Sequence, residues 1–344
     1  MLTRSEVIMP KVNKEKPLIE FLIPSYKRFE GAIVAASSIA RQIVECDLIN
    51  EVRITIVDDA SPDVTVDRLA GRLNMNSCDI EIIKNKKNKG ISRNIYDMVS
   101  GSCATFCTVL TDDDWLAAGC LRDIVKNLKS IEFDDYIGGI FTPRYSYLEN
   151  GQLHCVVCKP FASDRLIKPG SLSAIRYCSN GFILTGFIFR PNLFASKNWQ
   201  DNIDNGYFQV INYAFISSRF SIKFVNRNWF HHTVLNHCYW DAWGASPQEQ
   251  YRRLYGDYMD AVSYIAKNLP EIPFFRISRI AFMAYEIKNY SHSMVANKFN
   301  LRDLIGLTTA NTRSRFPFYC SLVLTFFCFG FMRALKPFES RDQA

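Results

Sequence analysis

The chain has 344 residues, of which 48% are hydrophobic, and a formal net charge of +7. This length and composition allow a sizeable core and fit one large domain with a smaller appendage, which excludes a largely disordered protein. The net charge is too modest to require a nucleic-acid partner, because anionic small molecules or lipid headgroups would match it equally well. We therefore expect that the protein does not bind nucleic acid. The eleven cysteines lie scattered in the sequence without regular metal-site spacing, and the N-terminus has no apolar signal segment, which together favour a reduced, cytoplasmic protein.

Four apolar, strand-like runs open the chain at similar intervals. They span residues 19–24, 52–57, 80–84 and 103–110. The intervening segments are long enough for helical crossovers, and residues 29–43 carry apolar side chains at helical spacing. The pattern predicts consecutive strand and helix units, and therefore an α/β fold with a mixed, mainly parallel sheet flanked by helices.

Polar residues follow each of the four runs. Because functional residues of parallel sheets lie at the carboxyl ends of the strands, we expect these groups to line one crevice. Each group alone has an ordinary alternative, namely a turn or a helix cap. They are Pro24, Ser25, Tyr26 and Arg28 after the first run, Asp58 and Asp59 after the second, Asn88, Gly90 and Arg93 after the third, and Asp112, Asp113 and Asp114 after the fourth.

The three consecutive aspartates are the most informative of these groups. A buried strand that ends in adjacent carboxylates offers hard oxygen ligands, which hold Mg²⁺ or Mn²⁺ together with phosphate groups. The alternative is a helix N-cap, because Leu121, Ile124, Val125 and Leu128 follow at helical spacing. One aspartate suffices for a cap, whereas three repel one another unless a cation is present.

The pattern changes in the second half of the chain. Residues 136–230 mix short apolar runs with turn residues and predict further strands and a pair of helices of the same domain. From about residue 247 the pattern is helical, which places a boundary near residue 245 between a domain of residues 1–245 and a helical region of residues 246–344. Residues 316–332 are uncharged, aromatic and flanked by basic residues, which favours peripheral association with the inner face of the cell membrane; a buried core helix is the alternative.

The order and spacing of the strand-end groups resemble those of the family 2 glycosyltransferases, which have a GT-A fold. The resemblance covers about the first 130 residues and rests on segments 21–28, 57–61, 88–94 and 110–115. It implies a hexosyltransferase-type enzyme that moves a sugar from a nucleotide-sugar donor to an acceptor hydroxyl, with inversion and with Mg²⁺ or Mn²⁺. The chain also resembles a divergent bacterial branch that makes surface polysaccharide such as O-antigen or capsule. Together with the membrane-associating segment, this implies a lipid-linked or oligosaccharide acceptor.

The resemblance also assigns roles to individual residues. Asp114 and Asp112 become metal ligands, and His232 becomes a third, since a neutral imidazole suits that role; an ordinary surface histidine is the alternative. The residues placed at the donor nucleotide are Pro24, Ser25, Tyr26, Arg28, Asp58, Asp59, Asn88, Gly90, Arg93, Asp112 and Asp113.

The catalytic base is where the sequence departs from the family. Many members carry a Glu-Asp pair before an apolar helix that ends in arginine, whereas residues 205–213, before Arg219, contain no acidic pair. Asp204 and Asp201 lie just upstream and are the candidates for the base that deprotonates the acceptor hydroxyl; loop carboxylates or helix caps are the alternative.

The missing pair also supports an alternative function, a catalytically silent subunit that binds nucleotide sugar or assists assembly at the membrane. A nucleotidyltransferase is disfavoured because residues 23–28 lack the glycines of a phosphate-binding loop. The sequence leaves the sugar, the acceptor and the oligomeric state open.

Overall fold

The computed structural model describes residues 6–8, 16–62, 66–73, 78–148, 150–157, 161–170, 173–174, 184–194 and 196–234, and short stretches between residues 256 and 269. The chain divides into two compact units, residues 1–236 and 237–344. The boundary predicted near residue 245 and the segment 316–332 lie outside the described residues and remain predictions. In the part of the chain that the structure describes, every helix is too short or too polar to cross a membrane.

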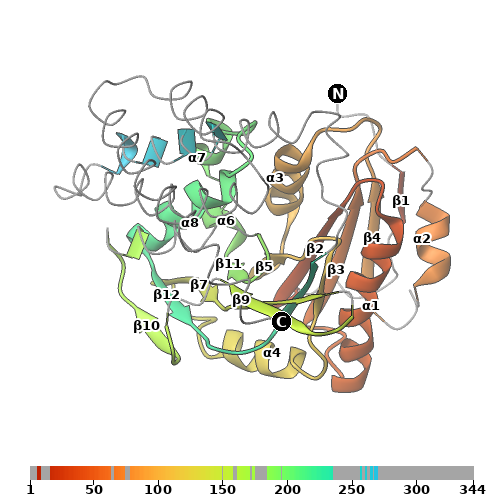
Figure 1. Ribbon diagram of the computed structural model, residues 1–344, viewed down its shortest axis with the longest axis horizontal. Coiled ribbons are helices and arrows are strands. Elements are labelled where there is room, and N and C mark those ends of the chain that lie inside the picture. Colours follow the sequence, from red (N-terminus) through yellow and green to blue (C-terminus); the bar gives the residue numbers. More distant parts are fainter. Residues whose placement is uncertain are drawn as a thin grey trace, which may run out of the picture. The chain divides into compact units, whose positions relative to one another are not determined.

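Strands and helices alternate in the N-terminal half of the first unit (Figure 1). The four predicted runs form β2, β3, β4 and β5, and the predicted helix forms α1. In chain order the elements are β1 (Glu6–Ile8), β2 (Ile19–Ser25), α1 (Phe29–Cys46), β3 (Val52–Asp58), α2 (Val66–Arg72), β4 (Asp79–Lys84), α3 (Ile91–Gly101), β5 (Phe106–Val109), β6 (Asp114–Leu116), α4 (Leu121–Lys129), β7 (Ile137–Phe141), β8 (Arg144–Leu148), β9 (Leu153–Val157), β10 (Arg165–Ile167), β11 (Phe187–Phe189), α6 (Pro191–Phe194), α7 (Lys197–Gln200), α8 (Phe208–Arg219), β12 (Ser221–Phe224) and β13 (Phe230–Val234).

The large sheet contains nine described strands in the order β1-β4-β3-β2-β5-β11-β7-β12-β10. Strands β4, β3, β2 and β5 run parallel to one another, as predicted from the crossover segments. Strand β11 is antiparallel to both β5 and β7, and it makes the sheet mixed. The predicted fold class is therefore confirmed, and the polar ends of β2, β3, β4 and β5 lie at the same edge.

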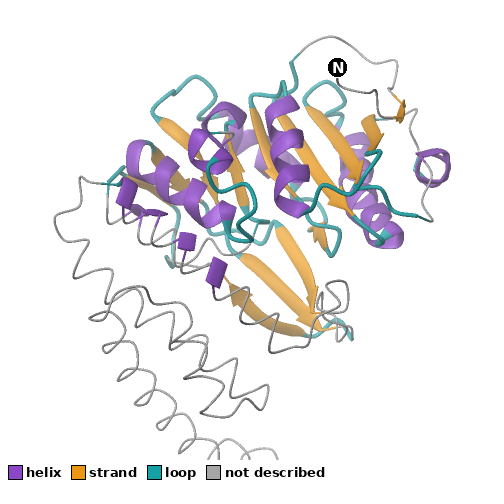
Figure 2. Ribbon diagram, turned by 90° about the horizontal axis from the view of Figure 1, so that it is seen from above, coloured by secondary structure: helices purple, strands orange, loops and turns teal. Residues whose placement is uncertain are grey.

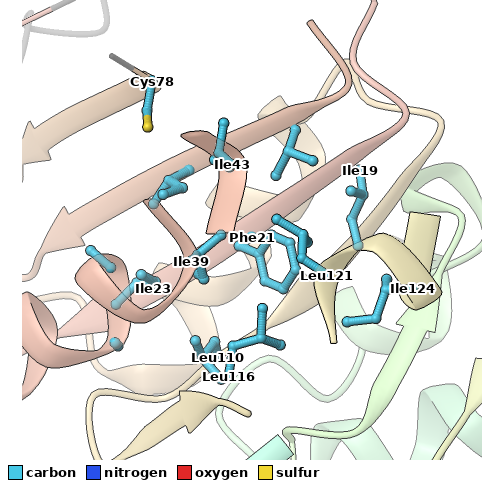
Figure 3. Close-up of a cluster of buried hydrophobic side chains, with 14 of the residues drawn as sticks. Ile19, Phe21, Ile23, Ile39, Ile43, Cys78, Leu110, Leu116, Leu121 and Ile124 are labelled. Atoms are coloured by element: carbon cyan, nitrogen blue, oxygen red, sulfur yellow. The ribbon is translucent and has the colours of Figure 1, made fainter. Parts of the chain in front are cut away.

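Helices lie on both faces of the large sheet (Figure 2), because the side chains of its strands alternate between two apolar clusters. Phe21 of β2 packs with Ile39 of α1 and Leu121 of α4 on one face (Figure 3). Leu22, the next residue, packs with Ile95 of α3 on the other face. Successive side chains of a strand point to opposite faces, so a strand that is apolar throughout is buried on both sides.

A second, smaller sheet has the strand order β6-β13-β8-β9 and was not predicted. Its first strand, β6, begins at Asp114, whereas helix α4 begins at Leu121 with Cys120 as its N-cap. The helix-cap alternative for the three aspartates is therefore wrong. Antiparallel pairing of β13 with β6 places His232 opposite Asp114, and parallel pairing with β8 places it opposite Ser146.

Candidate active site

The three aspartates lie against the first turns of helix α1. A Cβ atom on Gly31 would lie 1.9 Å from the backbone oxygen of Asp112. Any side chain at residue 31 would therefore displace one of the two segments, and glycine alone permits this approach. The close contact sets the position of the aspartates relative to the N-terminal end of α1.

Asp114 is almost fully buried, and four side chains surround its carboxylate. Nδ1 of His232 lies 2.7 Å from Oδ1. Oδ2 accepts a hydrogen bond from Thr111 at 2.7 Å and another from the hydroxyl group of Thr185. Nη1 of Arg144 lies 3.4 Å from both oxygens. Burial opposes ionisation, but the charge of Arg144 and the contacts with His232 and Thr185 outweigh it and hold the pKa of Asp114 below its usual value.

Asp113, Asp114 and His232 form a cluster that could hold a metal ion. One ligand atom from each lies within 4.8 Å of the other two. Nδ1 of His232 is 3.5 Å from Oδ2 of Asp113, and the hydroxyl oxygen of Thr111 also lies 2.7 Å from Oδ1 of the same residue, so the two aspartates share its one proton. Two carboxylate oxygens and one imidazole nitrogen at such separations fit one divalent cation after small shifts.

Asp112, which we expected among the metal ligands, lies beside this cluster and faces Arg28. Nη1 of Arg28 is 3.1 Å from Oδ1 of Asp112 and 3.8 Å from Oδ2 of Asp113. Burial raises the pKa of Asp112 to about 7, and the negative charge of Asp113 adds to the rise. The charge of Arg28 and a hydrogen bond with Ser25 oppose it. The structure thus groups Asp113, rather than Asp112, with Asp114 and His232.

A pocket of about 540 Å³ adjoins the aspartates, and we call it the acidic-cluster pocket. Its wall combines cationic side chains, carboxylates and two aromatic residues, as expected for a ligand with both phosphate and hydroxyl groups. The lining residues are Lys27, Arg28, Phe29, Glu30, Gly31, Val34, Arg68, Asp112, Asp113, Asp114 and Trp115.

Asp59 ties the end of β3 to the loop that follows β4. Its buried carboxylate accepts hydrogen bonds from the Asn85 amide at 2.8 Å and from the backbone N–H groups of Lys89 and Gly90 at 3.0 and 2.9 Å. Its own backbone N–H donates to the carbonyl oxygen of Ser25 at 2.8 Å. Gly90 has φ +82, a conformation that favours glycine. Asp59 therefore shapes the crevice by holding its loops together.

Asp58 plays a similar part for the loop after β2. Its carboxylate accepts a hydrogen bond of 2.9 Å from the backbone N–H of Ser61, and the Ser61 hydroxyl oxygen accepts one of 2.7 Å from the backbone N–H of Lys27. Lys27 has φ 57, which a residue with a side chain rarely adopts. Pro24 is buried within β2, and the half-buried Tyr26 follows it, with Nζ of Lys27 5.1 Å from the centre of its ring.

Asn88 and Arg93 line a different pocket, of about 650 Å³, at the N-terminal end of α3. Nε and Nη2 of Arg93 donate hydrogen bonds of 3.0 and 3.1 Å to the two carboxylate oxygens of Asp204. No described residue lines both this pocket and the acidic-cluster pocket. The lining residues are Lys87, Asn88, Lys89, Arg93, Tyr96, Asp97, Gln200 and Ile203.

The two candidate bases follow helix α7, next to this second pocket. The side chain of Asp204 is 79% exposed, and the hydrogen bonds from Arg93 lower its pKa. A low pKa keeps the carboxylate ionised but also weakens it as a base. Among the described residues that line the acidic-cluster pocket, neither Asp201 nor Asp204 occurs.

Three side chains that contact the carboxylates were not among the predicted site residues, namely Thr111, Arg144 and Thr185. Thr111 directly precedes the aspartates, and Thr185 precedes Gly186, whose φ of +106 marks a turn. Arg144 begins β8 and belongs to no recognisable motif. Its role follows only from the pairing of β8 with β13.

Comparison with known proteins identifies the class. Residues 20–189 match the family described as glycosyl transferase family 2. The chain belongs to this family and is a glycosyltransferase, as the strand-end motifs predicted.

The solved structures most useful for comparison come from S. aureus. TarS residues 1–349 in complex with UDP-GlcNAc is 15% identical to this chain, with 93% of this chain and 91% of that chain covered and a TM-score of 0.54. The same protein in complex with UDP gives the same identity and coverage and a TM-score of 0.51. At this identity the likeness concerns the fold, and it confirms the GT-A type. No curated protein matches the chain in sequence.

Proposed function

We propose that this glycosyltransferase moves a sugar from a nucleotide-sugar donor to a hydroxyl group of a lipid-linked or oligosaccharide acceptor, in the synthesis of a surface polysaccharide such as O-antigen or capsule. The observation that carries the proposal is the cluster of Asp113, Asp114 and His232 beside a pocket at the carboxyl ends of parallel strands in a family 2 chain. The UDP-GlcNAc and UDP complexes of TarS support a nucleotide-sugar donor.

The residues of the cluster fit Mg²⁺ or Mn²⁺. We assign the ligands to Asp113, Asp114 and His232, because Asp114 is ionised and buried and its neighbours lie within reach of one ion. A bound divalent ion supplies Lewis-acid stabilisation of the negative charge on the leaving diphosphate. Thr111 and Thr185 hold the Asp114 carboxylate in place, since both donate hydrogen bonds to Oδ2.

The donor nucleotide is assigned to the crevice along the ends of β2 to β5. Tyr26 offers aromatic surface there, the buried Ser25 hydrogen-bonds with Asp112, and Arg93 offers a fork of donors for a phosphate or a carbonyl group. Asp58 and Asp59 act by shaping the loops around the nucleotide, because hydrogen bonds within the protein engage both carboxylates.

Inversion requires a base on the acceptor side of the sugar. Asp204 is the first candidate and Asp201 the second, and both flank the Arg93 pocket. For Asp204 to take a proton, its carboxylate must leave the two hydrogen bonds that Arg93 donates. Donor binding at Arg93 would release it, since a phosphate group competes for the same guanidinium.

Peripheral attachment to the inner face of the membrane is proposed from residues 316–332 and their basic flanks. Flotation of the full chain with vesicles that contain anionic lipid tests it. Replacement of Arg313, Arg315, Arg333 and Lys336 by glutamine should abolish flotation. Equal recovery of both proteins in the floating fraction contradicts this part of the proposal.

Turnover itself is tested with UDP-GlcNAc and a panel of other nucleotide sugars in the presence of Mn²⁺, by measuring nucleotide release with and without saccharide acceptors. Asp114→Asn should lose at least about a hundredfold in rate, as expected when transition-state charge stabilisation is removed. The matched control is Asp135→Asn, an exposed carboxylate in the turn after α4. Full turnover by Asp114→Asn contradicts the metal site, and binding without turnover on any acceptor favours the silent subunit.

A further inference from the structure

Arg144 places a positive charge inside the acidic cluster. Its side chain is 12% exposed, and Nη1 lies 3.4 Å from each oxygen of the fully buried Asp114 carboxylate. Its Nε is buried and has no hydrogen-bond partner among the described residues. A buried guanidinium with an unpaired donor is costly, so a nearby carboxylate must compensate it.

The pairing of β8 with β13 holds Arg144 at this position. Arg144 lies opposite Phe230, and Ser146 lies opposite His232. Residues two apart on a strand share a face, so Arg144 and His232 project from the same side of the small sheet. Phe230 is fully buried. Because the strand pairing fixes the backbone of Arg144, rotation of its own side chain is enough to take the guanidinium away from Asp114.

The contact between Arg144 and Asp114 is looser than the other contacts of this carboxylate. Charge-assisted hydrogen bonds are about 2.7 to 2.9 Å long, whereas both distances from Nη1 are 3.4 Å. His232 and Thr111 approach the same carboxylate to 2.7 Å. Arg144 thus acts as a counter-charge to Asp114 more than as a fixed hydrogen-bond partner.

A divalent ion and the guanidinium need the same oxygens. Mg²⁺ lies about 2.0 to 2.1 Å from its oxygen ligands, and a guanidinium beside those oxygens repels it. We propose that Arg144 is the counter-charge of the acidic cluster in the metal-free protein, and that a divalent ion binds by displacing its guanidinium from Asp114. Arg144 is then a positioning residue that sets metal affinity. This inference rests on the metal site proposed above.

The test compares Mn²⁺ binding and thermal unfolding of three proteins. In Arg144→Met the competing charge is gone, so the Kd for Mn²⁺ measured by calorimetry should fall by about tenfold or more. The metal-free protein should melt at a lower temperature, because three adjacent aspartates lose a counter-charge. Arg144→Lys, which keeps a charge on a different donor geometry, should lie between the wild type and Arg144→Met.

The matched control is Arg53→Met. Arg53 pairs with Asp79 at 2.8 Å and is 20% exposed, and it joins β3 to β4 of the large sheet, whereas Arg144 lies in the small sheet. Loss of this pair should lower the melting temperatures of the metal-free and Mn²⁺-loaded proteins equally and leave the Kd for Mn²⁺ unchanged. In Arg144→Met, by contrast, the gap between the two melting temperatures should widen.

Each outcome is decisive. Unchanged or weaker Mn²⁺ binding by Arg144→Met overturns the role of Arg144 and leaves the metal site standing. If Arg144→Met folds only in the presence of Mn²⁺, the result supports the inference. If it folds neither with nor without Mn²⁺, the Kd of Arg144→Lys for Mn²⁺ decides: a Kd below that of the wild type supports the inference, and an equal or higher Kd overturns it. Absence of Mn²⁺ binding in every protein overturns the inference and the metal site, while nucleotide release judges glycosyl transfer separately.

Discussion

Arg93 donates two parallel hydrogen bonds to Asp204, which lies 111 residues further along the chain. The pair joins the N-terminal end of α3 to the turn after α7. It also joins a residue predicted to contact the donor with a residue predicted to act as the base. In the structure, Arg93 and Asp204 therefore occupy each other. Their hydrogen bonds must break before Arg93 can bind the donor and before Asp204 can accept a proton.

Replacement of Asp204 by asparagine separates these two roles. If Asp204 is the base, Asp204→Asn should lower kcat by about 10² to 10⁴, with little change in the KM for the donor. If Asp204 only orients Arg93, the KM for the donor should rise and kcat should change little. Steady-state kinetics with a varied donor concentration distinguishes the two, and Asp201→Asn serves as the neighbouring comparison.

The pH dependence of turnover adds an independent check on Asp204. Hydrogen bonds from Arg93 lower its pKa, so the carboxylate stays ionised throughout the neutral and mildly acidic range. A pH–rate profile of the wild type should therefore show no acid limb from Asp204 above about pH 5. An acid limb near neutral pH that disappears in Asp204→Asn would contradict the pairing in the active enzyme.

Asp59→Ala should both destabilise the protein and weaken donor binding. The substitution leaves the N–H donors of Asn85, Lys89 and Gly90 without their acceptor, and loss of such buried, charge-assisted bonds costs about 3 kcal/mol. Urea unfolding measures the free energy of unfolding, and titration with UDP measures binding. Asp135→Asn, on an exposed turn, should change neither quantity.

Gly31→Ala tests the contact between α1 and the aspartates. The new Cβ would overlap the carbonyl oxygen of Asp112, so the free energy of unfolding should fall by about 2 to 3 kcal/mol and Mn²⁺ binding should weaken. The control is Gly71→Ala in α2, where an added Cβ meets no atom within 4 Å. Because alanine favours a helix over glycine, this control should gain up to about 1 kcal/mol. A neutral Gly31→Ala variant would show that the approach of α1 to Asp112 is not needed.

The stability of the metal-free protein should depend on Asp112 at mildly acidic pH. Burial raises its pKa from 3.8 to about 7, so the folded state binds more protons than the unfolded state between these values. The contribution of Asp112 to stability is therefore present below pH 3.8 and is lost as the pH rises to about 7. Relative to Asp112→Asn, the wild type should lose ~4 kcal/mol across this range. Urea unfolding in EDTA at several pH values measures the difference, and parallel pH profiles of the two proteins would contradict the raised pKa.

Local patterns were sufficient for the elements around the crevice. The apolar runs became β2 to β5 because strands buried on both faces must be apolar throughout, and α1 followed from apolar residues at helical spacing. The order of the polar groups after these strands then predicted the family correctly. The predicted strands and helix depend on the spacing of nearby residues, and the predicted family depends on the order of short motifs. Both can be read from the sequence without knowing which strands pair.

The partners of the site residues could not be read in this way. Arg144, Thr185 and His232 reach Asp114 from β8, a turn and β13, and only the pairing of distant strands brings them together. Which aspartate faces Arg28 and which faces His232 depends equally on that register.

Periodicity and motif order can be read along the chain, and they were enough to predict the class of fold, the family and a carboxylate cluster at the end of β5. The folded chain was needed to see that Asp113 joins Asp114 and His232 and that Asp112 pairs with Arg28. It was also needed to see that Asp204 pairs with Arg93 and that Arg144 lies beside Asp114. These contacts join residues far apart in the chain. Strand register decides which charges lie beside each carboxylate. Burial then raises the pKa of Asp112, whereas Arg144 and His232 lower that of Asp114.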